Sequence, residues 1–177
     1  IPSYPTHSRF WEVIEKHKIT QFYTAPTAIR SLAKEKIDYV QKFALDSLKV
    51  IGSVGEPINE EAWHWYNVHV GGKRCPLVDT WWQTETGGIL ISAIPFVTPT
   101  KPTYASLPFP GIKPVIMDEL RNEIEVNQKS GSLCIEFPWP AIARTIWGDH
   151  QRYIDTYFKK FPGKYFSGDG ALRDEVG

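Results

Sequence analysis

Short apolar runs alternate with amphipathic segments over the first 94 residues, and no other feature constrains the fold as strongly. The periodicity predicts helices over residues 8–18, 25–36 and 59–72, and strands over residues 19–25, 47–54, 76–82 and 88–94. Apolar strands separated by amphipathic helices are typical of a mainly parallel sheet that helices cover on both faces. We therefore expect an α/β architecture for this part of the chain.

The ends of the predicted helices carry residues that suit those positions. Ser8 is expected to cap the first helix, and Pro26 is tolerated in the first turn of the second. Asn59 is expected to cap the third helix, which Gly71 and Gly72 would end. These signals support the boundaries that the periodicity predicts.

The second half of the chain has a different pattern. Residues 95–114 contain six prolines, which predicts a connection without regular structure. Three short strands are expected at 115–119, 132–137 and 164–169, with one amphipathic helix at 149–161. The pattern predicts an α/β portion over residues 1–97, followed over residues 98–177 by a proline-rich connector and a smaller β-rich portion.

Composition argues against several classes of protein. Lys plus Arg and Asp plus Glu number 20 each, so no net field favours nucleic acid or an anionic membrane. No apolar run approaches the roughly 20 residues that a membrane span needs, and the first ten residues lack a signal-peptide core. Cys75 and Cys134 lack metal-site or disulfide-framework spacing, which favours two free thiols in a reducing cytoplasm.

Two polar segments follow predicted strands, at the edge of the sheet where α/β proteins bind ligands. In "GSVGEP" (52–57), the backbone of Gly55, Glu56 and Pro57 could lie against an adenine-sized ring. In "DTWWQTETGG" (79–88), three threonine hydroxyls could hold a phosphate oxygen and a carboxylate could bind Mg²⁺. These residues are Thr80, Thr84, Thr86 and Glu85. The alternative is that the threonines only form turns and that Glu85 is solvated.

Trp81 and Trp82 interrupt the second of these segments with large aromatic side chains. Successive strand residues point to opposite faces, so both rings cannot pack on the same side while the strand continues. We expect one tryptophan in the core and the other as the wall of a pocket at the end of the strand. The alternative is that both belong to the core.

Four segments occur in an order and spacing that is typical of one family. They are "YTAPTAIRSL", "GSVGEPINEEAW", "VDTWWQTETGG" and "YFSGDGALRDEVG", and "GDHQRY" agrees with them. Together they resemble the AMP-forming acetyl-CoA synthetases of the adenylate-forming superfamily, over nearly the whole chain. The resemblance implies part of a doubly wound α/β subdomain followed by part of a small β-barrel-like subdomain. It also implies ATP, Mg²⁺, coenzyme A and acetate as small-molecule substrates or cofactors, with no nucleic-acid or membrane partner.

The resemblance assigns a role to each matching residue. The ATP or AMP site would be lined by Gly55, Glu56, Pro57, Asp79, Thr80, Trp81, Trp82, Gln83 and Thr84. Thr84 would meet the α-phosphate, Glu85 would face the metal, and Asp169 would hold the ribose hydroxyls. Trp82, with Val54 in the wall, would limit the acyl pocket to a short acid.

Some parts of the family pattern differ or are missing. Ser3 stands where the family often has an asparagine near coenzyme A, so Ser3 is a weak candidate for contact with coenzyme A. The phosphate loop of the family would lie before residue 1, and the domain with the catalytic lysine after residue 177. We therefore expect a central fragment that is inactive alone.

Three alternatives remain open. A sibling ligase could act on propionate or another short acid, since one buried methylene contributes only about 0.8 kcal/mol. A glycoside hydrolase would use Glu56 and Glu85 as paired carboxylates, with the tryptophans as sugar platforms. A non-enzymatic binding module is the third alternative.

Overall fold

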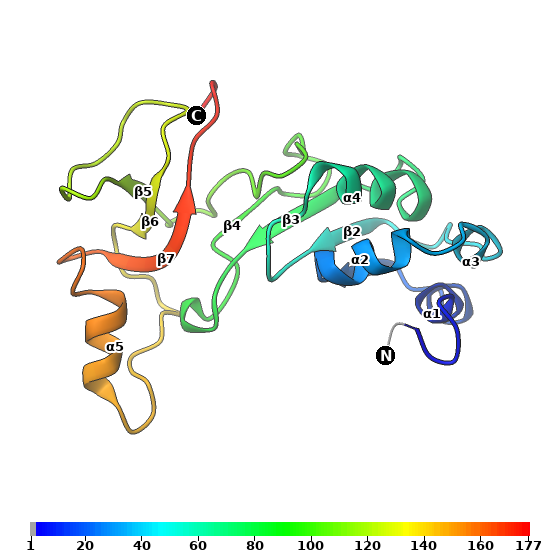
Figure 1. Cartoon of the computed structure of the whole chain (residues 1–177), viewed down its shortest axis with the longest axis horizontal. Coiled ribbons are helices and arrows are strands. Elements are labelled where there is room, and N and C mark those ends of the chain that lie inside the picture. Colours follow the sequence, from blue (N-terminus) through cyan, green and yellow to red (C-terminus); the bar gives the residue numbers. More distant parts are fainter. Residues whose placement is uncertain (1–2) are drawn as a thin grey trace. The chain divides into compact units, whose positions relative to one another are not determined.

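A computed structural model describes residues 3–177 of the chain (Figure 1). Contacts divide the described residues into two units, each of which is described by itself. The α/β unit comprises residues 3–81 and 91–107, and the β-rich unit comprises residues 82–90 and 108–177. The chain thus leaves the α/β unit after Trp81 and returns to it at Ile91. The division between residues 97 and 98 stays a prediction.

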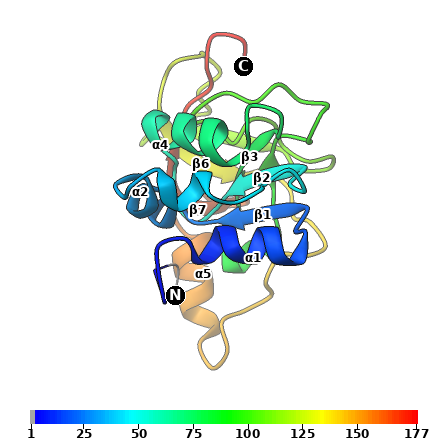
Figure 2. The same ribbon diagram turned by 90° about the vertical axis from the view of Figure 1, so that its right-hand side faces the viewer.

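The α/β unit contains the alternating elements that the sequence predicts. Its helices are α1 (Arg9–His17), α2 (Pro26–Ala33), α3 (Asp38–Gln41), α4 (Glu60–Trp65) and the π-helix η1 (Tyr66–Val70). Its strands are β1 (Gln21–Thr24), β2 (Val50–Ser53), β3 (Leu77–Trp81) and β4 (Ile91–Ser92), in the sheet order β1-β2-β3-β4. Strands β1, β2 and β3 are parallel, and Figure 2 shows them side by side with α1 next to β1.

The register of the strands explains which face of this sheet is buried. Phe22, Ile51 and Leu77 are partners across β1, β2 and β3 and point to one face, where they join the main hydrophobic cluster. The helices of the unit all contribute side chains to this cluster. On the opposite face, Tyr23 is 46% exposed. Its partners Gly52 and Val78 are buried, so the exposure on this face is greatest at the β1 edge of the sheet.

Strand β4 also departs from the predicted parallel pattern. It pairs antiparallel to β3, with Thr80 opposite Ser92 and Trp81 opposite Ile91. The chain connects β3 to β4 through residues 82–90 rather than through a helix, and a parallel pair would need a crossover of a dozen or more residues. The polar segment after β3 is therefore an excursion between two antiparallel strands.

The two predicted N-cap residues form no capping hydrogen bond through their side chains, and one predicted helix is divided into two elements. Ser8 precedes α1, but its hydroxyl donates to Glu12 Oε1 at 2.7 Å instead of capping a backbone N–H. Asn59 precedes α4 without a capping hydrogen bond from its side chain within residues 3–177. The helix predicted over residues 59–72 is α4 continued by η1, and Gly71 ends it as expected. The short helix α3 was not predicted.

The β-rich unit is built on an antiparallel sheet. Its elements are the 3₁₀ turn η2 (Thr84–Thr86), β5 (Pro114–Met117), β6 (Gly131–Ile135), α5 (His150–Tyr157) and β7 (Tyr165–Ala171). The strands pair in the order β5-β6-β7, and a buried cluster forms around Val115, Met117, Cys134 and Phe161. Asp149 caps α5 by accepting from the Arg152 backbone N–H at 3.0 Å. The three strands do not close on themselves, so the barrel-like form expected here is not observed in residues 108–177.

Three statements about absences hold for the described part of the chain. No helix in residues 3–177 is long and apolar enough to span a membrane. No group of three or more His, Cys, Asp and Glu side chains converges as a metal site would require. Cys75 and Cys134 are both buried free thiols, as the sequence predicted.

Candidate functional site

A chain of buried hydrogen bonds occupies the ends of β2 and β3 in the α/β unit. The Ser53 hydroxyl donates to Asp79 Oδ1 at 2.7 Å, and the Thr80 hydroxyl donates to the Ser53 carbonyl at 3.0 Å. The Tyr23 hydroxyl lies 2.5 Å from the Thr80 hydroxyl and therefore acts as its donor. Burial raises the pKa of Asp79, and the hydrogen bond from Ser53 opposes this shift.

The turn after β2 contains the predicted polar segment "GSVGEP". Gly55 has a φ of +94°, a conformation that favours glycine, although a side chain there would meet no atom within 4 Å. Arg30 of α2 pairs with Glu56 through a contact of 2.7 Å between Nη2 and Oε1. Val54 is half-buried and Pro57 is exposed. The turn is thus ordered by an ion pair and leaves part of its backbone accessible.

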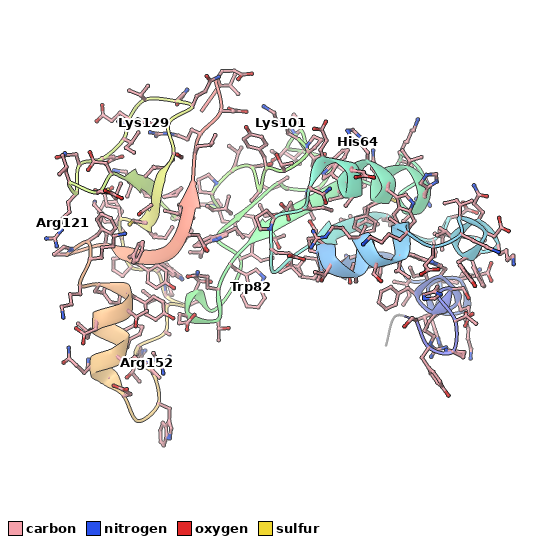
Figure 3. The ribbon with its side chains drawn as sticks, viewed as in Figure 1. His64, Trp82, Lys101, Arg121, Lys129 and Arg152 are labelled. Atoms are coloured by element: carbon pink, nitrogen blue, oxygen red, sulfur yellow. The ribbon has the colours of Figure 1, made fainter. Side chains whose placement is uncertain are left out.

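Neither tryptophan of the segment is buried in a core. Trp81 is the last residue of β3 and is half-buried, while Trp82 (labelled in Figure 3) is 40% exposed. The prediction that one of them is a core residue is therefore wrong. Because β3 ends at Trp81, the alternation of strand faces does not apply to Trp82. Its exposed ring surface suits the wall of a binding site better than a core.

The turn around η2, in the β-rich unit, is fixed by Thr86. This side chain is fully buried, accepts from the Gln83 backbone N–H at 2.9 Å and approaches the Gln83 carbonyl at 2.7 Å. The indole N–H of Trp139 donates to the Thr86 carbonyl at 2.8 Å. Gly87 follows with a φ of +71°, and a Cβ atom there would collide with the carbonyl of Ala141. The shape of the turn is therefore determined by packing as well as by hydrogen bonds.

The three candidate threonines have different environments. Thr80 and Thr86 are buried, and their hydroxyls form hydrogen bonds inside the protein. Thr84 is exposed, and its hydroxyl has no hydrogen-bond partner among residues 3–177. Of the three, Thr84 has the hydroxyl that is available to an external phosphate oxygen.

Glu85 is held from two sides within the β-rich unit. The Tyr157 hydroxyl donates to Glu85 Oε1 at 2.6 Å, and the Glu85 carbonyl accepts from the Ala143 N–H at 2.8 Å. Burial, followed by the hydrogen bond to Glu85, raises the pKa of Tyr157 to about 12. The Tyr157 ring stacks on Tyr165, with 5.3 Å between ring centroids and 11° between planes. Tyr157 therefore stays protonated at neutral pH and remains a donor to the carboxylate.

Gln83 connects the same turn to β7. Its Nε2 donates to the Ser167 carbonyl at 2.8 Å and to Asp169 Oδ2 at 3.0 Å. Its Oε1 accepts from the Tyr165 hydroxyl at 2.7 Å. The backbone N–H of Asp169 donates to the Ser167 hydroxyl at 3.0 Å. The β-rich unit thus brings Gln83, Thr84, Glu85 and Asp169 into one cluster.

The remaining predicted residues lie elsewhere. The α/β unit holds Val54, Gly55, Glu56, Pro57, Asp79, Thr80 and Trp81, and Ser3 is exposed near the start of the described residues. Sequence reasoning missed the partners Tyr23, Arg30, Ser53, Trp139, Tyr157 and Tyr165. Tyr157 and Tyr165 lie 72 and 82 residues from the side chains that they contact, so no local pattern could pair them.

The glutamates of the glycoside hydrolase alternative are each engaged by a protein partner, Glu56 by Arg30 and Glu85 by Tyr157.

Comparison with known proteins decides the family. The sequence model of the AMP-binding enzymes matches residues 1–147, which include both polar segments of the candidate site. This chain is a member of the AMP-binding enzyme family. The resemblance that the motifs indicated is therefore confirmed.

Relatives of this AMP-binding chain align along almost all of it. An acetyl-coenzyme A synthetase of Leptospira biflexa is 55% identical over 181 residues, covering 100% of this chain and 27% of the relative. An acetyl-coenzyme A synthetase of Coprinopsis cinerea is 56% identical, with 99% and 27% covered. Acetyl-coenzyme A synthetase 2 of Pseudomonas aeruginosa is 57% identical, with 100% and 27% covered. The chain thus spans about a quarter of the length of the curated relatives that it matches.

Proposed function

We propose that this chain is part of an AMP-forming acetate–CoA ligase. The observation that carries the proposal is its identity of 55% to 57% with acetyl-coenzyme A synthetases along nearly its whole length. Two polar turns with accessible groups, at residues 54–57 and 83–86, support it from the structure. Neither a glycoside hydrolase nor a simple binding module accounts for both observations.

The reaction would proceed in two displacements. A carboxylate oxygen of acetate attacks the α-phosphorus of ATP, the bond to the β-phosphate breaks, and pyrophosphate leaves. The thiolate of coenzyme A then attacks the acyl carbon of the adenylate, and AMP leaves. For the first step, this chain would orient the nucleotide and stabilise negative charge at the α-phosphate.

Each unit would contribute its own nucleotide contacts. In the α/β unit, the backbone of Gly55, Glu56 and Pro57 would lie against the adenine, and residues 79–81 would line the site. In the β-rich unit, the exposed hydroxyl of Thr84 would donate to an α-phosphate oxygen, and Asp169 would accept from the ribose hydroxyls. The accessibility of Thr84, in contrast to Thr80 and Thr86, supports its role.

Glu85 fits the binding of Mg²⁺ together with a nucleotide. Mg²⁺ is usually held by one or two protein carboxylates and by substrate phosphates. Glu85 Oε1 accepts from Tyr157, which leaves the second carboxylate oxygen to face a cation. The ion, when bound, would neutralise charge on the phosphates. Glu85 would hold the ion, and Tyr157 would hold the carboxylate in place.

Acetate and coenzyme A would contact fewer residues of this chain than the nucleotide would. Trp82, with Val54 in the wall, would close the acyl pocket behind a short acid, and its 40% exposed ring is available for such a contact. Ser3 would lie near coenzyme A. Propionate is the second candidate substrate, because only one methylene separates it from acetate. We propose a cytoplasmic setting, which two buried free thiols suit.

A pyrophosphate exchange assay tests this proposal. In a full-length enzyme that contains this sequence, acetate should drive exchange of labelled pyrophosphate into ATP, and propionate should do so less efficiently. Exchange that is independent of acetate, or absent, would contradict the proposal. A higher efficiency with propionate would identify the sibling ligase instead.

A further inference from the structure

Both N–H groups of the Gln83 side chain are engaged by the protein itself, and its oxygen also has a protein donor. Its two N–H groups donate to the Ser167 carbonyl and to Asp169 Oδ2, and its oxygen accepts from Tyr165. An amide has two donors and one acceptor oxygen, so both donors are already in use. Gln83 therefore has no N–H left for a nucleotide, although its segment belongs to the motif that lines the ATP site.

The orientation of this amide follows from its neighbours. The Ser167 carbonyl and the Asp169 carboxylate can only accept, so the nitrogen of Gln83 must face them. The oxygen must then face Tyr165, whose hydroxyl is obliged to donate. Burial raises the pKa of Tyr165, so this hydroxyl keeps its proton throughout the physiological range. If the amide were reversed, its oxygen would face the Ser167 carbonyl and the Asp169 carboxylate, and three acceptors would lie together without a donor.

Tyr165 is itself fixed by packing. Its side chain is buried, and its ring stacks on Tyr157 and meets Trp139 edge-on with 5.4 Å between ring centroids. Asp169 is exposed, so its carboxylate would lose rotamer freedom on binding a ligand if nothing held it beforehand. A packed tyrosine and an amide with both donors engaged therefore restrain an exposed carboxylate.

We propose that Gln83 and Tyr165 are positioning residues for Asp169, and that Gln83 acts on the nucleotide through this carboxylate rather than by direct contact. The inference rests on the proposed function, in which Asp169 accepts from the ribose hydroxyls. Tyr165 sets the orientation of the Gln83 amide, and the amide holds Oδ2 of Asp169. The carboxylate held in this way would accept from the ribose hydroxyls.

The test compares variants of a full-length enzyme that contains this sequence, with ATP and with 2′,3′-dideoxy-ATP. Gln83→Met keeps the volume of the side chain and removes its donors. It should raise the KM for ATP about tenfold, leave kcat within about twofold, and lower the preference for ATP over the dideoxy analogue by a similar factor. Gln83→Glu places a second carboxylate beside Asp169 and should raise KM further. Tyr165→Phe should act in the same direction with a smaller effect.

A double-mutant cycle separates positioning from direct contact. If Gln83 acts through Asp169, then Gln83→Met combined with Asp169→Ala should be no worse than Asp169→Ala alone. Losses that multiply would overturn the inference, as would a Gln83→Met enzyme that keeps the parent's preference for ATP. Asp169→Ala alone decides the proposed ribose role, because a variant with unchanged KM and unchanged analogue preference would refute that role.

Gln128 provides the matched control. Its Nε2 donates to Glu175 Oε2 at 3.0 Å, so it is a second glutamine–carboxylate pair, on the surface of the same unit. Gln128→Met should leave both nucleotide parameters unchanged. Melting temperatures of all variants complete the test, because a purely structural Gln83 would lower the melting temperature without changing the preference between the two nucleotides.

Discussion

The end of β3 and the turn that follows it use the same residue types in opposite ways. At the end of β3, Asp79 and Thr80 are buried and their polar atoms are bonded within the α/β unit. In the turn at residues 83–86, Thr84 is exposed, and Glu85 is held by a tyrosine through one oxygen. The comparison indicates that the first region keeps the sheet together, whereas the second presents accessible polar groups on a rigid support.

Two glycines, Gly55 in the turn after β2 and Gly87 directly after the turn at residues 83–86, test whether packing fixes the second turn more strongly than the first. Gly87→Ala would combine a positive φ with a collision against the Ala141 carbonyl, so the enzyme should lose about 2 to 5 kcal/mol of stability. Gly55→Ala meets no neighbouring atom and should lose only about 1 to 2 kcal/mol, from its φ alone. Chemical denaturation of both variants measures the difference. Equal losses would show that packing does not fix the turn after Glu85.

The two tryptophans lie on either side of the boundary between the regions. Trp82→Gly should remove the proposed wall of the acyl pocket, lower kcat/KM for acetate and raise it for hexanoate. Four additional methylenes can gain about 3 kcal/mol when buried, which is roughly a hundredfold. Because Trp82 is 40% exposed, the melting temperature should change little. Trp81→Gly is the control, and it should destabilise β3 without this change of preference. A Trp82→Gly enzyme that is unstable but keeps the preference for acetate would reverse the assignment.

The threonines sharpen the comparison further. Thr84→Val should lower kcat about tenfold to a hundredfold with little change in stability, because it removes the proposed donor to the α-phosphate. Thr86→Val removes the hydroxyl that pairs with the half-buried Gln83 N–H and should destabilise the protein by about 1 to 3 kcal/mol. Kinetics should therefore show a loss of kcat for Thr84→Val, and melting curves should show a loss of stability for Thr86→Val. A Thr84→Val enzyme with the parent's kcat would remove this residue from the proposed chemistry.

The sequence predicted the elements well where the signal is local. The bounds of α1, α2 and β2 follow from periodicity and from residues such as Pro26, and the proline-rich stretch before β5 contains no helix or strand, as expected. The antiparallel pairing of β4 and the open β-rich sheet were not predicted. Pairing direction depends on where the chain returns, which a strand of two residues such as Ile91–Ser92 does not encode.

The candidate site shows the same limit. The motifs identified the segments, because a run such as "DTWWQTETGG" is specific enough to place a family. The family resemblance assigned the α-phosphate contact to Thr84, but the residue types alone did not distinguish Thr84 from Thr80 and Thr86, since identical side chains differ only in what surrounds them. The hydrogen bonds from Tyr157 to Glu85 and from Tyr165 to Gln83 could not be predicted either, because they connect residues far apart in the chain.

Asp79 provides the last and smallest test, which concerns pH. Burial raises the pKa of Asp79 above its ordinary value, so the folded protein holds this proton more tightly than the unfolded chain. Stability should then fall as pH rises from about 4, the pKa of an unfolded aspartate, to the raised folded pKa, and it should stay at the lower level above that value. Asp79→Asn keeps an acceptor for Ser53 and should remove this slope. Subtracting the denaturation midpoints of parent and variant across this range isolates the effect. If Asp79→Asn leaves the slope in place, the dependence comes from another group, and the carboxylate at the end of β3 is less buried than its position indicates.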